Sequence, residues 1–272
     1  MKDVRFTKLD NGLTVITDFN PSIETVFSGV WVSVGSRNET EDINGISHFL
    51  EHMAFNGTIG DDGYIKLEQG DSFKKIEKMG GWVNASTDYS VTDYINSTPL
   101  LENQDLEEQI KVLGSMTYNL ALTEEMIEKE KGPVCSEINM ILDDPTTVVL
   151  DQNVRTLFNV KSSADELVGG SVEHIKNLTR EKVKSYYDKY YTSDNMNLVI
   201  TGDVNPDEAI SLVAKNFHSY KKNNAGKHYV EKLHPINKAI RKDFISDKAS
   251  STIIVMGFSG FQAKNVKEKV LF

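Results

Sequence analysis

The chain has 272 residues, of which 39% are hydrophobic and 26% are charged, so it can form one large domain or two moderate ones with a substantial core. Its formal net charge of -10 argues against sequence-independent binding to nucleic acid or to an anionic membrane, because both ligands are themselves negatively charged. The single cysteine, Cys135, excludes an intrachain disulfide framework and a multi-cysteine zinc site.

The sequence shows no sign of a targeting or membrane-spanning segment. No apolar run approaches the length of a membrane span, and a strand-like segment begins at Val4 without a preceding basic and apolar stretch. We therefore expect a reduced, soluble, cytoplasmic protein whose partners include neither nucleic acid nor a membrane.

The first strands are predicted to form a hairpin. Arg5–Leu9 and Leu13–Phe19 flank Asp10-Asn11-Gly12, and an Asn-Gly pair supplies the positive φ angles of a tight turn. Further runs rich in β-branched and aromatic residues are predicted strands: Thr25–Val34, Trp82–Ser86, Val91–Ser97 and Asn197–Gly202.

Helices are predicted where apolar residues recur with a period of about 3.6 residues. These segments are Ile46–Phe55, Asp105–Leu120, Glu124–Leu142, Val148–Phe158, Thr179–Tyr191 and Asp207–Phe217. Because strands and helices are mixed without strict alternation, the predicted fold class is α+β.

The domain organisation is predicted from a change in composition near the C-terminus. Residues 1–219 are expected to form one domain, and residues 220–240 a linker, because the stretch that begins at Tyr220 is polar and basic. Ser251–Phe258 is predicted to be a strand, and residues 241–272 the beginning of a second, incomplete domain of similar kind. This strand weakly resembles Thr25–Val34, so an internal repeat and two unrelated strands both stay open.

The most informative motif is H-x-x-E-H at His48, Glu51 and His52. At about 100° per residue these side chains share one side of the predicted helix, so the two imidazoles can converge on one metal ion with the carboxylate beside them. The motif is known from zinc peptidases as the reverse of H-E-x-x-H. The alternative is a polar helix face that only meets solvent.

The helix predicted for Glu124–Leu142 offers candidates for a third metal ligand. Glu130 and Glu137 lie on or next to its apolar stripe, two turns apart, and a carboxylate facing a core is costly unless it is paired or bound to a metal. Considered alone, this helix leaves open that both glutamates point into solvent. The remaining candidate histidines are expected to be surface residues: His174, His218, His228 and His234.

With these residues identified, the chain resembles the insulinase, pitrilysin and mitochondrial processing peptidase family of zinc peptidases over essentially residues 1–260. The segments that carry the resemblance are Gly45–Phe55 (GISHFLEHMAF), Gly80–Thr87 (GGWVNAST), Glu128–Gly132 (EKEKG), Ser136–Ile138 (SEI) and Tyr190–Met196 (YYTSDNM). The resemblance implies a mostly antiparallel sheet flanked by helices, as the zinc-binding N-terminal half of a zinc-dependent endopeptidase.

The resemblance also implies a role for each site residue. His48, His52 and Glu137 would hold one Zn²⁺ ion per chain, and Glu51 would be the general base that takes a proton from the attacking water. Glu130 would support the catalytic site from outside the ligand set. This is consistent with general chemistry, because an outer carboxylate can orient a metal-binding imidazole.

Asn84-Ala85-Ser86 matches the family's edge strand beside the zinc. Such an edge can bind an extended peptide by main-chain hydrogen bonds, which predicts oligopeptides or unfolded, processing-type substrates. The alternative is an ordinary internal strand.

The chain departs from the family pattern in two respects. The spacing from His52 to Glu137 is longer than usual, with the additional residues expected near Gly60 to Gly70. Family members also pair the zinc-bearing half with a similar second half, whereas here the second half ends after its first strand. We therefore expect a second half-domain, a partner subunit or a homodimer to complete the enzyme. The alternatives are a non-catalytic assembly subunit and an inactive fragment that folds and binds metal.

Overall fold

The computed structural model describes residues 3–60, 64–99, 103–158, 168–222 and 238–258. The chain divides into two compact units, Met1–Ile138 with Val168–Tyr229, and Asn139–Leu167 with Val230–Phe272. Most of the predicted linker, and the last part of the predicted second domain, lie outside the described residues. No helix in the described part of the chain is long and apolar enough to cross a membrane.

The first unit is built on a six-stranded sheet with the order β1-β2-β6-β3-β5-β4. Neighbouring strands are antiparallel except β2 and β6, which are parallel, so the predicted mostly antiparallel sheet is confirmed. The strands are β1 (Asp3–Lys8), β2 (Thr14–Phe19), β3 (Thr25–Val32), β4 (Trp82–Thr87), β5 (Thr92–Pro99) and β6 (Met196–Gly202).

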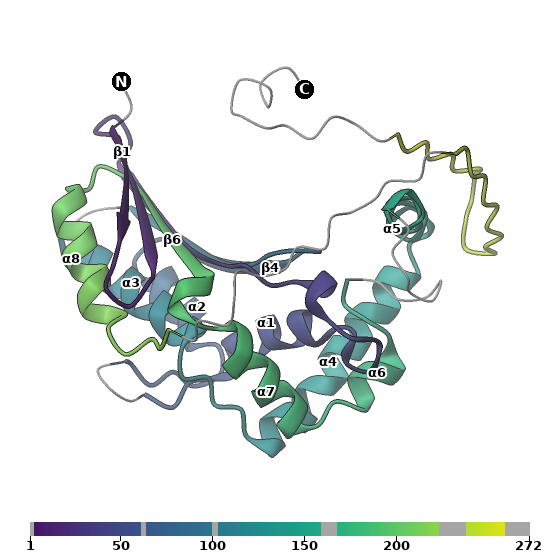
Figure 1. The fold of residues 1–272 in the computed structure, drawn as a ribbon, viewed down its shortest axis with the longest axis horizontal. Helices are drawn as coiled ribbons and strands as arrows, with labels where there is room; N and C mark the ends of the chain where they lie inside the picture. The colour runs from purple at the N-terminus through teal and green to yellow at the C-terminus, as the bar shows by residue number, and fades with distance from the viewer. Residues whose placement is uncertain (1–2, 61–63, 100–102, 159–167, 223–237, 259–272) are drawn as a thin grey trace. The chain divides into compact units, whose positions relative to one another are not determined.

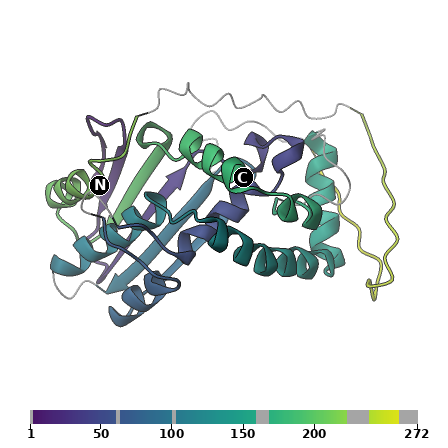
Figure 2. The same ribbon diagram turned by 90° about the horizontal axis from the view of Figure 1, so that it is seen from below.

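Helices of the first unit cover one face of this sheet, as Figure 1 and the view from below in Figure 2 show. Helices α1, α2, α3 and α8 contact its strands, and α7 packs against α1. The helices of the first unit are α1 (Ile46–Asn56), α2 (Asp71–Lys78), α3 (Asn103–Thr117), α6 (Val172–Lys176), α7 (Arg180–Tyr190) and α8 (Pro206–Asn216). Helix α4 (Glu124–Leu142) begins in the first unit and ends in the second, which also contains α5 (Pro145–Phe158). The short 3-10 helices are η1 (Ser36–Asn38), η2 (Glu41–Ile43) and η3 (Ser193–Asn195).

The core lies between the sheet and these helices. Along β3, alternate side chains point to opposite faces, and Val26, Val30 and Val32 are fully buried toward the helices. Phe49 and Leu50 of α1 are also fully buried. The motif helix is therefore anchored by its apolar side, which leaves its polar side to form a site.

The predicted hairpin is confirmed, although of the Asn-Gly pair Gly12 has a positive φ and Asn11 does not. Gly12 has a φ of 97°, in the region that glycine adopts without steric cost. The amide of Leu9 donates to the carbonyl of Leu13 at 2.9 Å, which closes the turn between β1 and β2.

One predicted element is wrong and two helices are additional. Ser251–Phe258 forms no strand, and the side chains of Ile254, Met256 and Phe258 are 78%, 76% and 80% exposed. A strand is held by hydrogen bonds to a neighbour, and no described strand pairs with this segment. Helices α2 and α6 were not predicted, because each is short and buries few apolar residues.

Candidate metal centre

The start of α1 is fixed by Gly45 and by the carboxylate of Glu39, which lies shortly before it in the sequence. Gly45 has a φ of 91°, and a Cβ atom there would lie 2.3 Å from the carbonyl oxygen of Gly169, so a larger residue does not fit. The carboxylate of Glu39 accepts hydrogen bonds from the amides of Gly45 at 2.8 Å and Ser47 at 2.9 Å. A negative charge is favourable at a helix N-terminus, so Glu39 stabilises the turn that carries His48.

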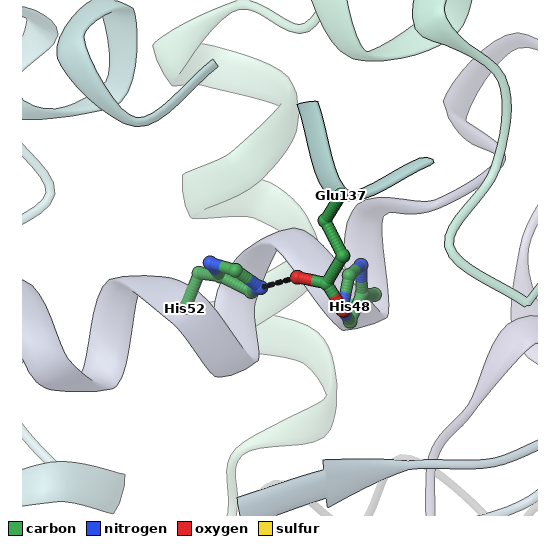
Figure 3. A group of neighbouring side chains, drawn as sticks. All are labelled: His48, His52 and Glu137. Carbon is green, nitrogen blue, oxygen red and sulfur yellow. Dashed lines mark ion pairs between the residues drawn. The ribbon is translucent and has the colours of Figure 1, made fainter. Parts of the chain in front are cut away.

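Three side chains converge between α1 and α4, as Figure 3 shows. Nε2 of His52 lies 3.1 Å from Oε2 of Glu137, and Nε2 of His48 lies 3.6 Å from Oε1 of the same carboxylate. One potential ligand atom from each residue lies within 4.8 Å of the others. Tetrahedral zinc with bonds of about 2.0–2.1 Å would hold ligand atoms about 3.3–3.4 Å apart, so this set fits a zinc ion.

The orientation of the His52 ring also favours metal binding. Its Nδ1 lies 2.9 Å from Oε1 of Glu130, whose side chain is buried. An ionised carboxylate can only accept, so Nδ1 carries a hydrogen, and Nε2, which faces Glu137, is the nitrogen that would bind a metal ion. Within the described residues, the buried Nδ1 of His48 has no hydrogen-bond partner. Of the two imidazoles, that of His52 is therefore supported by a carboxylate, Glu130.

Carboxylates dominate the electrostatics of this cluster. A hydrogen bond from His48 and the nearby ring of His52 hold the pKa of Glu137 below its ordinary value, although partial burial opposes the shift. Burial disfavours a charged His52, but the hydrogen bond to Glu130 and the charge of Glu137 together raise the pKa of that ring. The site thus favours positive charge at the point where the ligand atoms meet.

Glu51 lies next to the cluster without being one of the three converging side chains. The hydroxyl of Thr87, at the end of β4, donates to its Oε2 at 2.6 Å. Burial raises the pKa of Glu51 above its ordinary value, while the Thr87 hydrogen bond and the two histidines limit the rise. A raised pKa makes this carboxylate a better match for proton transfer near neutral pH.

A cleft of about 440 Å³ opens beside Glu51 and His52. The rings of Phe55 and Phe73 stack with their centroids 4.7 Å apart and give the cleft an apolar wall. The lining residues are Glu51, His52, Phe55, Asn56, Gln69, Gly70, Phe73, Asn84 and Glu130. The carboxylate of Glu51 can therefore meet a ligand that rests on an apolar surface.

The predicted peptide-binding segment lies on β4, which is the last strand in the sheet order. The turn after β4 is closed by a bond from the amide of Asp88 to the carbonyl of Val91, and Ala85 pairs with Tyr94. Hydrogen-bonded and non-hydrogen-bonded pairs alternate in antiparallel strands, so the amide and carbonyl of Ala85 face away from β5. The interpretation as an ordinary internal strand is therefore wrong for the described sheet.

The side chains on either side of Ala85 differ in position. Asn84 lines the cleft, and its Oδ1 accepts a hydrogen bond from the Ala85 amide at 2.9 Å. The hydroxyl of Ser86 donates to Asp93 at 2.6 Å and is not part of the cleft lining. Asn84 thus lies at the site and holds the Ala85 amide, whereas the Ser86 hydroxyl is held by Asp93 away from the cleft lining.

The other histidines do not join the cluster. Among the described residues, His48, His52 and Glu137 form the one group of histidine, cysteine or acidic side chains placed to share a metal ion. Nδ1 of His174 contacts the hydroxyl of Ser171, and His218 is exposed. His228 and His234 lie outside the described residues.

Sequence reasoning missed two side chains that contact the site. Asn56 follows His52 by four residues, and its Nδ2 donates to Oε2 of Glu130 at 2.6 Å. Thr87 follows Ala85 by two residues, on the same side of β4, and contacts Glu51. Helical and strand periodicity would have placed both on the correct faces, but neither pattern shows what the side chain meets.

Two family models match the chain. The insulinase model (peptidase family M16) matches residues 14–170, and the peptidase M16 inactive domain model matches residues 177–271. The first match includes all three converging side chains together with Glu51.

Named relatives agree with these matches. The chain is 33% identical over 211 residues to the mitochondrial-processing peptidase subunit beta of Blastocladiella emersonii, covering 78% of this chain and 43% of that protein. It is 30% identical over 259 residues to an uncharacterized zinc protease of Rickettsia felis, covering 95% of this chain and 59% of that protein. The chain thus spans about half the length of these curated relatives.

A solved structure shows the same fold. A protease from Helicobacter pylori superimposes with a TM-score of 0.75 at 24% identity, covering 87% of this chain and 55% of that one. The family models, the relatives and the converging histidines on an inverted motif lead to one assignment: the chain belongs to the insulinase family of peptidases, family M16.

Proposed function

We propose that this chain is the zinc-binding part of an endopeptidase that hydrolyses extended peptides. The observation that carries the proposal is the convergence of His48, His52 and Glu137, with the buried carboxylate of Glu51 beside them. Two imidazoles, one carboxylate and an open position for water are the usual arrangement of a catalytic zinc site. The names of the relatives, processing peptidase and zinc protease, agree with this reading.

The proposed reaction assigns separate tasks to the side chains. Bound zinc would polarise the scissile carbonyl and lower the pKa of water. Glu51 takes a proton from the attacking water and returns it to the leaving nitrogen, which its raised pKa favours. The hydroxyl of Thr87 holds the carboxylate of Glu51 in one orientation during both transfers.

The substrate we propose is a peptide in extended conformation. It pairs with the outward carbonyl of Ala85 and, once the Asn84 side chain releases it, with the Ala85 amide, beside the cleft that Asn84 lines. An apolar side chain of the peptide can rest on the stacked rings of Phe55 and Phe73. Main-chain pairing requires an accessible backbone, so oligopeptides and unfolded segments are favoured over folded proteins.

We further propose that a second half of the same family completes the enzyme, as another part of the chain, a partner subunit or a second copy. The chain spans 43% and 59% of two relatives, and one of these is named as a subunit.

The proposed activity predicts metal-dependent cleavage of unstructured peptides. The purified protein, tested alone and with its second half supplied, is expected to cut an unstructured peptide at internal bonds. A chelator should stop the cleavage, and added zinc should restore it. Mass spectrometry of the products checks this. A zinc-loaded protein that leaves such peptides intact under both conditions would contradict the proposed function.

The proposed pairing of the peptide with β4 predicts a specific effect of Ala85→Pro. Proline removes the outward amide, and an edge strand tolerates it. Loss of one hydrogen bond, worth about 0.5–1.5 kcal/mol, should raise KM by about 2- to 13-fold, with zinc content unchanged. Ala85→Ser keeps the amide and is the matched control. Equal KM values for the two variants would argue against pairing at Ala85.

A further inference from the structure

A chain of polar side chains connects the surface to His52. Nζ of Lys129 donates to Oε1 of Gln69 at 2.8 Å, and Nε2 of Gln69 donates to Oδ1 of Asn56 at 2.8 Å. Nδ2 of Asn56 then donates to Oε2 of Glu130 at 2.6 Å. The other oxygen of Glu130 faces Nδ1 of His52 at 2.9 Å.

The direction of these hydrogen bonds is fixed by the lysine. An ammonium group has donors only, so it must meet the carbonyl oxygen of Gln69 and turn the amide nitrogen of that residue toward Asn56. The carbonyl oxygen of Asn56 is then the acceptor, and its amide nitrogen faces Glu130. The reverse orientation of Asn56 would place two acceptors against each other.

Burial makes the Asn56 contact important for the carboxylate. Asn56 and Glu130 line the cleft, but both are only 6% exposed, so little of their contact is open to solvent. Asn56 ends α1 one turn after His52, and the two residues approach the two oxygens of Glu130 from the same helix. Two donors on different oxygens fix the plane of a carboxylate that one donor would leave free to rotate.

We propose that Asn56 is a positioning residue for the metal site, which acts through Glu130, and that Gln69 sets the orientation of its amide. The proposal rests on the proposed zinc site and extends it beyond the ligands. Glu130 holds the His52 ring with Nε2 toward the metal position, and Asn56 holds Glu130. Removing such an outer partner typically weakens metal binding by about 10- to 100-fold.

The experiment measures zinc affinity by competition with a chelator, which does not depend on activity. Asn56→Leu has a similar volume and no amide, and we expect it to weaken zinc binding by about 10-fold. If Asn56 acts through Glu130, the same change in a Glu130→Leu background, which has no acceptor for the Asn56 amide, should cost less than about twofold, because coupled residues are not additive. Equal losses in the two backgrounds, or no loss in either, would overturn the proposal.

A second variant keeps the test decisive if Asn56→Leu fails to fold. Gln69 is exposed, and Gln69→Glu preserves its shape while replacing the donor to Asn56 with an acceptor. The added negative charge alone would strengthen the binding of a cation, whereas loss of the Asn56 orientation should weaken it by about threefold, the effect of one hydrogen bond. Unchanged or tighter zinc binding would overturn the role of Gln69, and of Asn56 where its own variant does not fold.

The experiment distinguishes failure of the positioning role from failure of the zinc site itself. If the unmodified protein binds no zinc, the proposed function fails. If it binds zinc and the variants bind equally well, only the positioning role of Asn56 and Gln69 fails.

Discussion

Glu51→Gln is expected to retain zinc and to lose peptide hydrolysis by about 10²- to 10⁴-fold in kcat, the range for removing a general base. Glutamine has the shape of glutamate and can still accept a hydrogen bond from Thr87, which now donates to Glu51 at 2.6 Å. It cannot take a proton from water. The ligand atoms of His48, His52 and Glu137 stay in place, so zinc content should remain that of the unmodified protein.

The matched control is Glu125→Gln, an exposed glutamate in the first turn of α4. It makes the same chemical change away from the cleft and should leave kcat within about twofold of the original, as surface substitutions usually do. Zinc content by atomic absorption and kcat on one peptide are measured for both variants. Cleavage by Glu51→Gln at the original rate would remove Glu51 from its role as base.

His52→Ala is expected to lose the metal itself. His52 contributes one of three converging ligand atoms, and its ring is also the group that Glu130 orients. Loss of an outer partner alone costs about 10- to 100-fold in metal affinity, so loss of the ligand should cost more than about 100-fold. Zinc retained after gel filtration at low metal concentration measures the effect.

The control for this variant is His218→Ala, because His218 is exposed and does not belong to the cluster. It should bind as much zinc as the unmodified protein. Comparison of the two variants distinguishes the loss of a metal ligand from the loss of any histidine. If His52→Ala held zinc as tightly as His218→Ala, His52 would not be a ligand.

Much of the fold follows from local patterns along the chain. Glu124–Leu142 was predicted with the bounds that α4 has, and the hairpin turn at Gly12 followed from its Asn-Gly pair. Both are governed by interactions within a few residues. The incorrect strand at Ser251–Phe258 shows the limit, because β-branched composition indicates a strand only where a neighbouring strand is present to pair with it.

The site could be predicted in part, because some of its geometry is also local. His48 and His52 are one turn apart on one helix, so their convergence follows from helix geometry. The contact of Glu130 with His52 spans 78 positions, and that of Thr87 with Glu51 spans 36. Spacing cannot show such contacts. The family resemblance implied a supporting role for Glu130, and only the structure showed Thr87 and Asn56 beside the site.

The central claim is that His48, His52 and Glu137 build a zinc site, and zinc content per chain tests it most directly. The protein should be purified without chelator or metal-affinity resin, together with Glu137→Gln. We predict close to one zinc per chain in the unmodified protein and a sharp loss in the variant, which replaces the carboxylate ligand with a neutral amide. Absence of zinc from both proteins, even after zinc is added back to well-folded material, would contradict the account.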